Sequence, residues 1–241
     1  MYKTVAIFFT CFYSLSFFSG NAQQEEDVFY ERSLDTTIAF YKTSVAENLQ
    51  LYNGSEYHIA GHNVAGFPYF ETDSFMVGSI SYYHKSYTNV LLQYDIVKDV
   101  VIIKDYKQNY FIQLISSDID SFSILNKTFV PLSGDQNNYG VAPGFYEILY
   151  NGNVSLYAKK QKAEVQSINE GVAESKYVET NSYFLKKNGL FYEIENESSL
   201  LNVLNDKVNI VRKFAKENRI DFKNDFENAL VKTVAYYSGS K

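Results

Sequence analysis

Hydrophobic and polar residues alternate with a period of two through the middle of the chain, from about Glu56 onward. Because successive side chains of a strand point to opposite faces of a sheet, this pattern predicts half-buried strands. The segments recur at intervals of roughly 10 residues and are separated by polar turns, which is typical of an antiparallel meander. The expected strands cover residues 75–82, 90–94, 100–103, 110–115, 122–125 and 128–132.

Two Asn-Gly pairs predict tight hairpins further along the chain. Asn151-Gly152 and Asn188-Gly189 each lie between two apolar segments. Asn-Gly supplies the two residues with positive φ that a type I′ turn requires. The segment between these hairpins, residues 159–179, is rich in charged side chains, and we expect it to be a mobile connection. The strands expected around the two turns are 144–150, 154–158, 183–185 and 190–192.

The hydrophobic period becomes helical near both ends of the chain. Close to the N-terminus, Leu34, Ile38, Tyr41 and Val45 predict a helix that runs from Leu34 to about Leu49. The C-terminal part carries two further apolar stripes, with an expected break at Asn205-Asp206. The first stripe is Leu201, Leu204, Val208, Val211 and Phe214, and the second is Phe226, Leu230, Val234 and Tyr237.

Short capping signals frame the last of these helices. Asn224, followed three residues later by Glu227, resembles a capping box at a helix N-terminus. Gly239 follows the last apolar position, as is typical of a helix end. The sequence thus predicts that the final helix begins close to Asn224.

Together these patterns predict an α+β fold that is mainly β. We expect an antiparallel meander sheet of about 8–11 strands, strongly curved or partly closed, with an N-terminal helix and two or three C-terminal helices. The expected organisation is a signal peptide over residues 1–22, a flexible N-terminus over 23–33 and a single domain over 34–241. The helical segment of that domain covers about residues 197–238.

The first residues match the three-part layout of a secretory signal peptide. Lys3 supplies the positive charge, Val5–Phe18 is an apolar run, and Gly20 and Ala22 are small residues at positions −3 and −1 of a cleavage site. The alternative is a retained membrane anchor, but a run of roughly 14 residues is shorter than the ~20 that a bilayer requires. We expect cleavage after about Ala22 and a periplasmic or extracellular location.

Composition narrows the possible partners. The chain has 22 Tyr and 19 Phe but only 3 Pro, which suits a large sheet with long ladders. Cleavage would remove Lys3 and the only cysteine, Cys11, so the formal net charge would change from −6 to −7 and no thiol would remain. This balance disfavours nucleic acid as a partner. No second apolar segment is long enough to predict a transmembrane segment in the mature chain.

Two groups of side chains match a metal-binding pattern only in part. His58 and His62 have the spacing of a zinc-binding pair on a helix, but Gly61 lies between them and disfavours a helix. The segment Asp135–Gly140 begins like a calcium-binding loop, yet position 12 of that loop would be Tyr146 instead of a glutamate. We therefore predict no metal site.

Catalytic patterns are equally incomplete. Asp118 and Asp120 would share one face of a strand, and paired carboxylates of this kind can hydrolyse glycosides, but acids at a strand end are usually solvated. The sequence contains no Gly-x-Ser-x-Gly, no Gly-x-Gly-x-x-Gly and no phosphate-binding loop. We predict no catalytic residues and no cofactor.

Clustered aromatic residues are the remaining candidates for ligand contact. Tyr82, Tyr83 and Tyr87 lie around one expected turn, and Tyr106 and Tyr110 lie around the next. Exposed rings at these positions could stack on sugars or line an apolar cavity. The alternative, which we favour, is that they pack against cross-strand neighbours within the sheet.

Several strings in the chain resemble a group of uncharacterised, exported, β-rich proteins of Gram-negative bacteria. They are Leu51–Tyr57, Asn89–Asp99, Gly144–Gly152, Ser199–Leu201 with Asp206-Lys207, and the pair Tyr236-Tyr237. The resemblance implies a shared fold and export over nearly the whole mature chain. It implies no activity and assigns no site residues.

Three functional hypotheses follow. The first is a non-enzymatic envelope protein that binds a ligand or a partner through a sheet face or a sheet edge. The second is a periplasmic carrier of an apolar molecule, which requires an apolar concavity beneath a curved sheet. The third is a carboxylate-based hydrolase, which requires two acids with shifted pKa values in one cleft. The identity of the ligand and the oligomeric state are not predicted.

Overall fold

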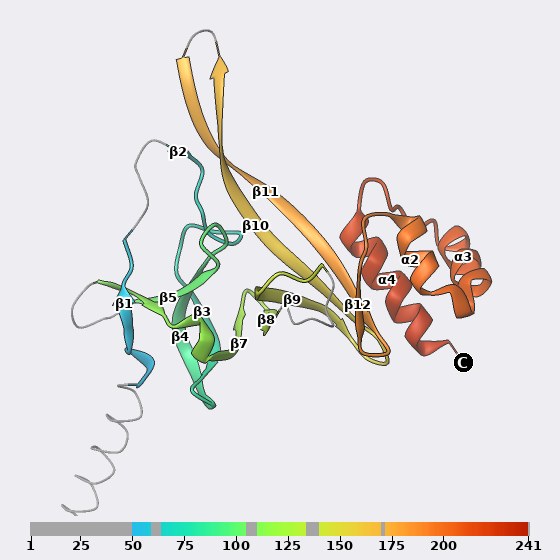
Figure 1. Cartoon of the computed structure of the whole chain (residues 1–241), viewed down its shortest axis with the longest axis horizontal. Coiled ribbons are helices and arrows are strands. Elements are labelled where there is room, and N and C mark those ends of the chain that lie inside the picture. The colour runs from blue at the N-terminus through green and yellow to red at the C-terminus, as the bar shows by residue number, and fades with distance from the viewer. Residues whose placement is uncertain (1–49, 59–63, 105–109, 134–139, 170–171, 241) are drawn as a thin grey trace, which may run out of the picture. The chain divides into compact units, whose positions relative to one another are not determined.

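A computed structural model describes residues 50–58, 64–104, 110–133, 140–169 and 172–240 of the chain, and it is mainly β (Figure 1). The strands are β1 (Gly54–Glu56), β2 (Val64–Ala65), β3 (Met76–Tyr82), β4 (Lys85–Asp95), β5 (Val100–Lys104), β6 (Phe111–Leu114), β7 (Ile119–Ile124), β8 (Lys127–Leu132), β9 (Gly144–Asn151), β10 (Ser155–Asn169), β11 (Val172–Lys187) and β12 (Leu190–Glu193). The helices are α2 (Glu197–Val203), α3 (Val208–Glu217) and α4 (Phe226–Gly239), with short 3₁₀ turns η1 (Ser116–Asp118) and η2 (Asn205–Lys207).

All of these strands belong to one sheet. Their order is β1-β6-β5-β4-β3-β7-β8-β9-β10-β11-β12, and β2 pairs with β11. Every pair is antiparallel except β2 with β11, which is parallel. Among the described residues the order has two free ends, β1 and β12, so the sheet is open. The prediction of a mainly β fold with an antiparallel sheet and C-terminal helices is confirmed in this coarse form.

The sheet is not one continuous meander. Strands β3 to β6 follow one another in space, and so do β7 to β12, but β7 pairs with β3 and not with β6. The turn η1 carries the chain from the end of β6 back to β3, where Ile119 lies opposite Tyr82. Strand β3 therefore joins two meanders, an arrangement that spacing along the sequence does not reveal.

Tight turns occur at different residues from those expected. Asn188 and Gly189 both have positive φ between the paired residues Lys187 and Leu190, so the predicted type I′ turn is confirmed. The prediction for Asn151-Gly152 is wrong. Asn151 pairs with Ser155, and Gly152 does not have positive φ. Gly152 instead lies close to the ring of Tyr150, and a Cβ there would be 2.9 Å from that ring.

Two further hairpins turn through residues with bulky side chains. Tyr83-His84 connects β3 to β4, and Leu125-Asn126 connects β7 to β8. All four of these residues have positive φ, which non-glycine residues rarely adopt. Since neither pair contains glycine, the sequence gives no turn signal of the kind that Asn-Gly provides.

Residues 159–179, expected to be a mobile connection, largely form the two longest strands of the sheet. Strands β10 and β11 pair without any register shift from Ser155 opposite Lys186 to Asn169 opposite Val172. Opposite charges meet in this ladder, since Lys162 lies opposite Glu179. Charged side chains occupy both faces of this paired ribbon, so charge content alone led to the wrong prediction.

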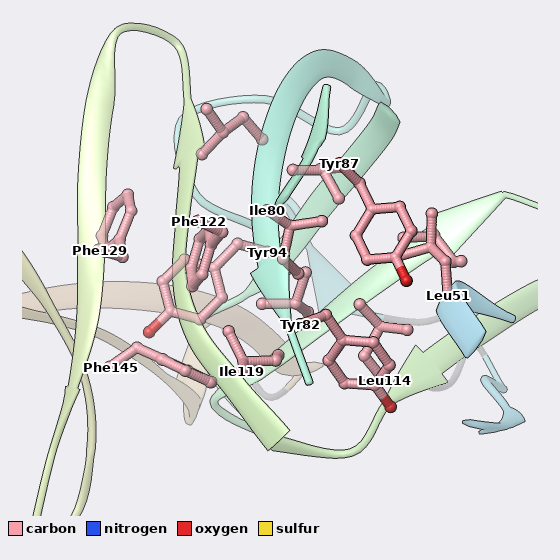
Figure 2. Packing of buried hydrophobic residues seen from close by; sticks show 14 of the residues in the cluster. Leu51, Ile80, Tyr82, Tyr87, Tyr94, Leu114, Ile119, Phe122, Phe129 and Phe145 are labelled. Atoms are coloured by element: carbon pink, nitrogen blue, oxygen red, sulfur yellow. The ribbon is translucent and has the colours of Figure 1, made fainter. Parts of the chain in front are cut away.

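An aromatic core packs against strands β3 to β9 (Figure 2). The ring of Tyr94 makes edge-on contacts with Phe122, Phe129 and Phe145, at centroid distances of 5.1, 5.1 and 6.1 Å. Phe122 and Phe129 lie opposite each other on β7 and β8 and stack at 4.9 Å. Cross-strand aromatic pairs of this kind stabilise a sheet beyond the area that they bury.

A second, mostly aliphatic core holds the C-terminal helices against the sheet. Leu204, Val211, Leu230 and Val234 are fully buried together with Leu156 of β10 and Leu185 of β11. Both predicted apolar stripes supply this core, and the predicted break at Asn205-Asp206 is the 3₁₀ turn η2. The remaining stripe residue Phe214 is partly buried and stacks on Tyr236 at 3.9 Å.

The helix caps differ from the prediction. A reciprocal capping box exists at the start of α2, where Asn196 and Ser199 bond each other's backbone. At α4 the N-cap is Asp225, with no side-chain cap bond, so the predicted box at Asn224 and Glu227 is wrong. Glu227 instead reaches Lys160 of β10, an ion pair between distant segments that local sequence does not encode. The predicted helix over 34–49 lies outside the described residues, as does the predicted signal peptide.

Candidate functional site

The β10–β11 hairpin changes character along its length, and its two parts are treated separately below. Its base comprises residues 155–162 of β10 and 179–187 of β11, and its outer part comprises residues 163–169 and 172–178. Leu156, Ala158 and Leu185 in the base are fully buried. Figure 1 shows the two strands as one long paired ribbon with β12 beside the base.

Two adjacent lysines of β10 are buried in the base, and each is neutralised on its own face of the sheet. The Lys159 ammonium lies 2.7 Å from Asp99 Oδ2 and donates to the Phe145 carbonyl at 3.1 Å. Asp99 also accepts a hydrogen bond from the Tyr94 hydroxyl. Burial, together with the charge of Asp99, raises the pKa of Tyr94 well above its ordinary value. Lys159 thus connects the hairpin to the aromatic core.

Lys160, on the opposite face, is part of a row of alternating charges. It pairs with Glu227 of α4 and lies 3.7 Å from Glu147 Oε2, and Lys127 of β8 lies 3.1 Å from Glu147 Oε1 and 3.3 Å from Glu71. Burial raises the pKa of Glu147, against the opposing effect of Lys127. The row therefore joins α4, the hairpin and strands β8 and β9, and its centre, Lys160 with Glu147, is removed from water.

Solvent access to the centre of this charged row is restricted. Glu147 is 4% exposed and is enclosed by two lysines. A general acid must reach a substrate proton within hydrogen-bond distance, and burial leaves the Glu147 carboxylate little room for such a contact. The row is best understood as the anchor that fixes the base of the hairpin.

Beyond Lys162, the hairpin carries apolar side chains that are exposed. Val165 is 42% exposed, Ile168 is 78% exposed and Val178 is 37% exposed. Val165 and Val178 lie on one face of the ribbon and Ile168 lies on the other, as the register requires. Among the described residues, these three side chains therefore present apolar surface on both faces of the outer part.

The edges of the outer part are also largely open. On the β11 side, β2 pairs only with Ser175 and Lys176. On the β10 side, the last described contact is the hydrogen bond from the Lys162 N–H to the Ile96 carbonyl. Alternate residues of a strand direct their N–H and C=O groups to the same side. The backbone groups of Glu164, Gln166 and Ile168 therefore point away from β11, as those of Lys162 do.

A shallow hollow of about 360 Å³ lies where the β11–β12 turn meets α2 and η2. Lys187 in its wall donates to the Val203 carbonyl at 2.8 Å and lies 2.6 Å from Asp206 Oδ1. The hollow is lined by Lys187, Asn188, Tyr192, Asn202, Val203 and Asn205. This largely polar lining does not suit an apolar cargo, and the carrier hypothesis stays a prediction.

The five tyrosines predicted as ligand contacts do not form one exposed group. Tyr82 and Tyr87 are buried in the aromatic core (Figure 2), and the Tyr82 hydroxyl donates to the Asn53 carbonyl. Tyr83 and Tyr110 are partly buried and pack against the same core, whereas Tyr106 lies outside the described residues. Tyr82 and Tyr87 thus contribute to packing, and contact of the group with a ligand stays a prediction.

The paired carboxylates do not have the expected geometry. Asp118 ends the 3₁₀ turn η1, and only Asp120 lies on strand β7, so the two residues do not share one strand face. Asp120 accepts hydrogen bonds from the Ser81 hydroxyl and from the His84 N–H, and its carboxylate lies 2.9 Å from the His84 ring. These contacts, with the Ser81 bond the largest, lower the pKa of Asp120. The carboxylate therefore positions the Tyr83-His84 turn.

The metal-binding candidates fall mainly outside the described residues. His58 is not in a helix, and its carbonyl accepts a hydrogen bond from Lys98, whereas His62 and residues 135–139 lie outside. Within the part of the chain that the structure describes, no three His, Cys, Asp or Glu side chains are grouped as metal ligands would be. In that same part, no helix is both long enough and apolar enough to cross a membrane.

Comparisons with known proteins identify no relative. No protein-family model matches the chain, and neither the curated proteins nor the solved structures include a match. The candidate site is therefore defined by its own geometry, as an exposed and unprotected hairpin on a buried, charged base.

Proposed function

We propose that this protein is a non-enzymatic binding protein that recognises a partner protein through the outer part of the β10–β11 hairpin. The carrying observation is that this part stays paired with unbroken register while its apolar side chains are exposed on both faces. Exposed apolar patches with polar surroundings are typical of protein interaction sites. The partner is expected to cover at least one face or one edge of the ribbon.

The conformational entropy lost when the hairpin becomes ordered supports this interpretation. Ordering a residue costs about 1–2 kcal/mol of backbone entropy, and an isolated two-stranded hairpin in water is marginally stable at best. In the outer part, the described backbone pairing that offsets this cost is the β10–β11 ladder and the short β2 pairing. The anchored base, with Lys159 and Lys160 each held by an acid, presents the ribbon in one orientation. A pre-oriented strand pair loses less entropy on binding than a flexible loop would.

Export belongs to the same proposal. The signal peptide expected over residues 1–22 would place the hairpin in the periplasm or outside the cell, where its partner would be another envelope or extracellular protein. Mass spectrometry of the native N-terminus tests this part directly. A mature chain that begins at Gln23 supports export, and an intact Met1 on the purified protein contradicts it.

Site-specific photocrosslinking tests the recognition surface. A benzoylphenylalanine residue is introduced at Val165 on the outer part or, as the control, at Lys213 on the exposed face of α3, where the side chain is 75% exposed. We expect a discrete covalent adduct with another polypeptide from position 165 and none from position 213. The proposal fails if position 165 gives no adduct or if both positions give the same adducts.

A further inference from the structure

The free edge of β10 lacks the usual protection against strand addition. Natural sheet edges are commonly blunted by lysine, proline, a β-bulge or a covering segment. Between Ala163 and Ile168 the strand contains no lysine and no proline, and Glu164 is its one charged residue. The β10–β11 register has no shift in this region. Among the described residues, this edge is therefore open to another strand.

The backbone defines which groups would bond to that strand. The N–H of Lys162 points away from β11, because it donates to the Ile96 carbonyl at 3.2 Å. The next residues with the same orientation are Glu164, Gln166 and Ile168. Glu164, Gln166 and Ile168 therefore offer their N–H and C=O groups to another strand. The preceding outward-facing residue, Lys162, already bonds to Ile96.

We infer that this edge binds a second copy of the chain, with the two β10 strands antiparallel around a twofold axis at Gln166. This inference rests on the proposed function and names the partner at that same site. In this register Gln166 lies opposite Gln166 of the other copy, and Glu164 lies opposite Ile168. Each of the three outward-facing residues then meets an outward-facing residue, which is the condition for a hydrogen-bonded antiparallel pair.

Like-charge repulsion and the backbone groups already in use select this register over its neighbours. A twofold axis at Glu164 would place two carboxylates directly opposite each other, which destabilises a strand pair. An axis at Val165 would require the Lys162 N–H, which already bonds to Ile96. An axis at Ser167 would pair only Gln166 with Ile168 among the described outward-facing residues. The axis at Gln166 brings no like charges together and covers Ile168, the most exposed of the large hydrophobic residues in the hairpin.

The expected dimer is weak, because a seam of about six residues per strand buries less surface than a standard interface. Analytical ultracentrifugation of the protein, purified from cells that export it, measures the association between about 1 and about 500 µM, the range in which small interfaces associate. We expect a monomer–dimer equilibrium that shifts toward the dimer across this range.

Substitutions of Gln166 test the axis. Gln166→Pro removes an N–H that is not used by β11, so the hairpin is preserved but strand addition is blocked. We expect at least about tenfold weaker association with an unchanged melting temperature, equivalent to about 1.4 kcal/mol. The matched control Gln166→Val keeps the N–H and should associate as the wild type does. Gln166→Glu should weaken association, because it places two carboxylates at the axis.

The outcomes separate this inference from the proposed function. A chain that stays monomeric up to the highest concentration overturns the inference, and so does a Gln166→Pro variant that dimerises normally. If the chain is monomeric but Val165 still crosslinks to a different protein, the proposed function stands and only the second copy as partner is wrong. If the chain dimerises and Val165 crosslinks to itself, both are supported.

Discussion

The base and the outer part of the β10–β11 hairpin share one uninterrupted ladder but differ in almost everything else. In the base, Lys159 and Lys160 are 5% exposed and each contacts a carboxylate, whereas in the outer part Val165 and Ile168 are substantially exposed. Charged residues are thus buried where apolar residues would be expected, and apolar residues are exposed where charged ones would be expected. Pairing alone does not produce this inversion, since the register is the same throughout.

The two parts of the hairpin are stabilised by different interactions. The base is covered on both faces, with the helices on one side and a cluster of Tyr146, Phe184 and Phe191 on the other, so its ion pairs operate with little solvent screening. Among the described residues, the outer part is held mainly by its own cross-strand pairing and by β2. Substitutions should therefore have large effects in the base and small ones in the outer part.

Removing the Lys160 ammonium should give the largest effect. Lys160→Ala leaves Glu147 and Glu227 without their shared cation, and breaking a largely buried pair in this way costs about 3–5 kcal/mol. The control Lys176→Ala removes an exposed lysine of the outer part and should change stability by less than about 0.5 kcal/mol. Chemical denaturation measures both, and equal effects would show that the charged row does not anchor the base.

The type I′ turn at the end of β11 should give an intermediate effect. Gly189 has a φ of +82°, so Gly189→Val forces a β-branched residue into the left-handed region at a cost of about 1–3 kcal/mol. Gly189→Asn is the matched control, because asparagine tolerates that region. Thermal unfolding of the two variants distinguishes backbone strain from the mere loss of glycine, and an unchanged midpoint for Gly189→Val would contradict the turn assignment.

Hydrophobic periodicity and turn residues predicted much of the fold but not the long β10–β11 hairpin. Alternation identified the β3 to β9 strands approximately, and helical spacing identified the stripes that contain Leu204 and Val234. The return of β7 to β3 could not be predicted, since it is set by long-range pairing. Lys160 suggested a solvated segment because its partners, Glu147 and Glu227, are 13 and 67 residues away in the sequence. The alternation of Ala163, Val165 and Ser167 was the one local signal of a strand there.

The pH dependence of the contact between the hairpin and η2 should be a smaller effect. Hydrogen bonds from Lys187 and Tyr237 lower the pKa of Asp206 below its ordinary value of 3.8. A carboxyl group whose pKa is lower in the folded state contributes stability above its unfolded pKa and loses it as the pH falls through the folded pKa. Asp206→Asn should thus cost less than about 1 kcal/mol at neutral pH, because this pair is partly exposed.

The stability difference between the wild type and Asp206→Asn should remain constant at neutral pH. It should shrink as the pH falls below 3.8, the ordinary pKa of the Asp206 carboxyl group. Denaturation of both proteins across this range measures it. A difference that persists in full at the lowest pH would show that the side chain acts through its shape and not through its charge.

Shortening the hairpin should give the smallest effect and is the sharpest test of the comparison. Ala163 and Val178 lie opposite each other and direct their backbone groups toward one another, so Asn-Gly can replace residues 164–177 as a two-residue turn between them. Every buried residue of the base is kept, including the contacts of Lys162 with the Phe67 and Tyr69 carbonyls. Only the rest of the outer part and its pairing with β2 are lost, so stability should change by less than about 0.5 kcal/mol.

The matched control shortens the hairpin further, placing Asn-Gly between Lys159 and Ser182, which also lie opposite each other. This second variant lacks Lys160 and should lose about 3 kcal/mol or more. If the first variant is as unstable as the second, the outer part belongs to the folded core and its availability for a partner is excluded. If it keeps the wild-type stability but no longer dimerises, the outer part serves recognition and not folding.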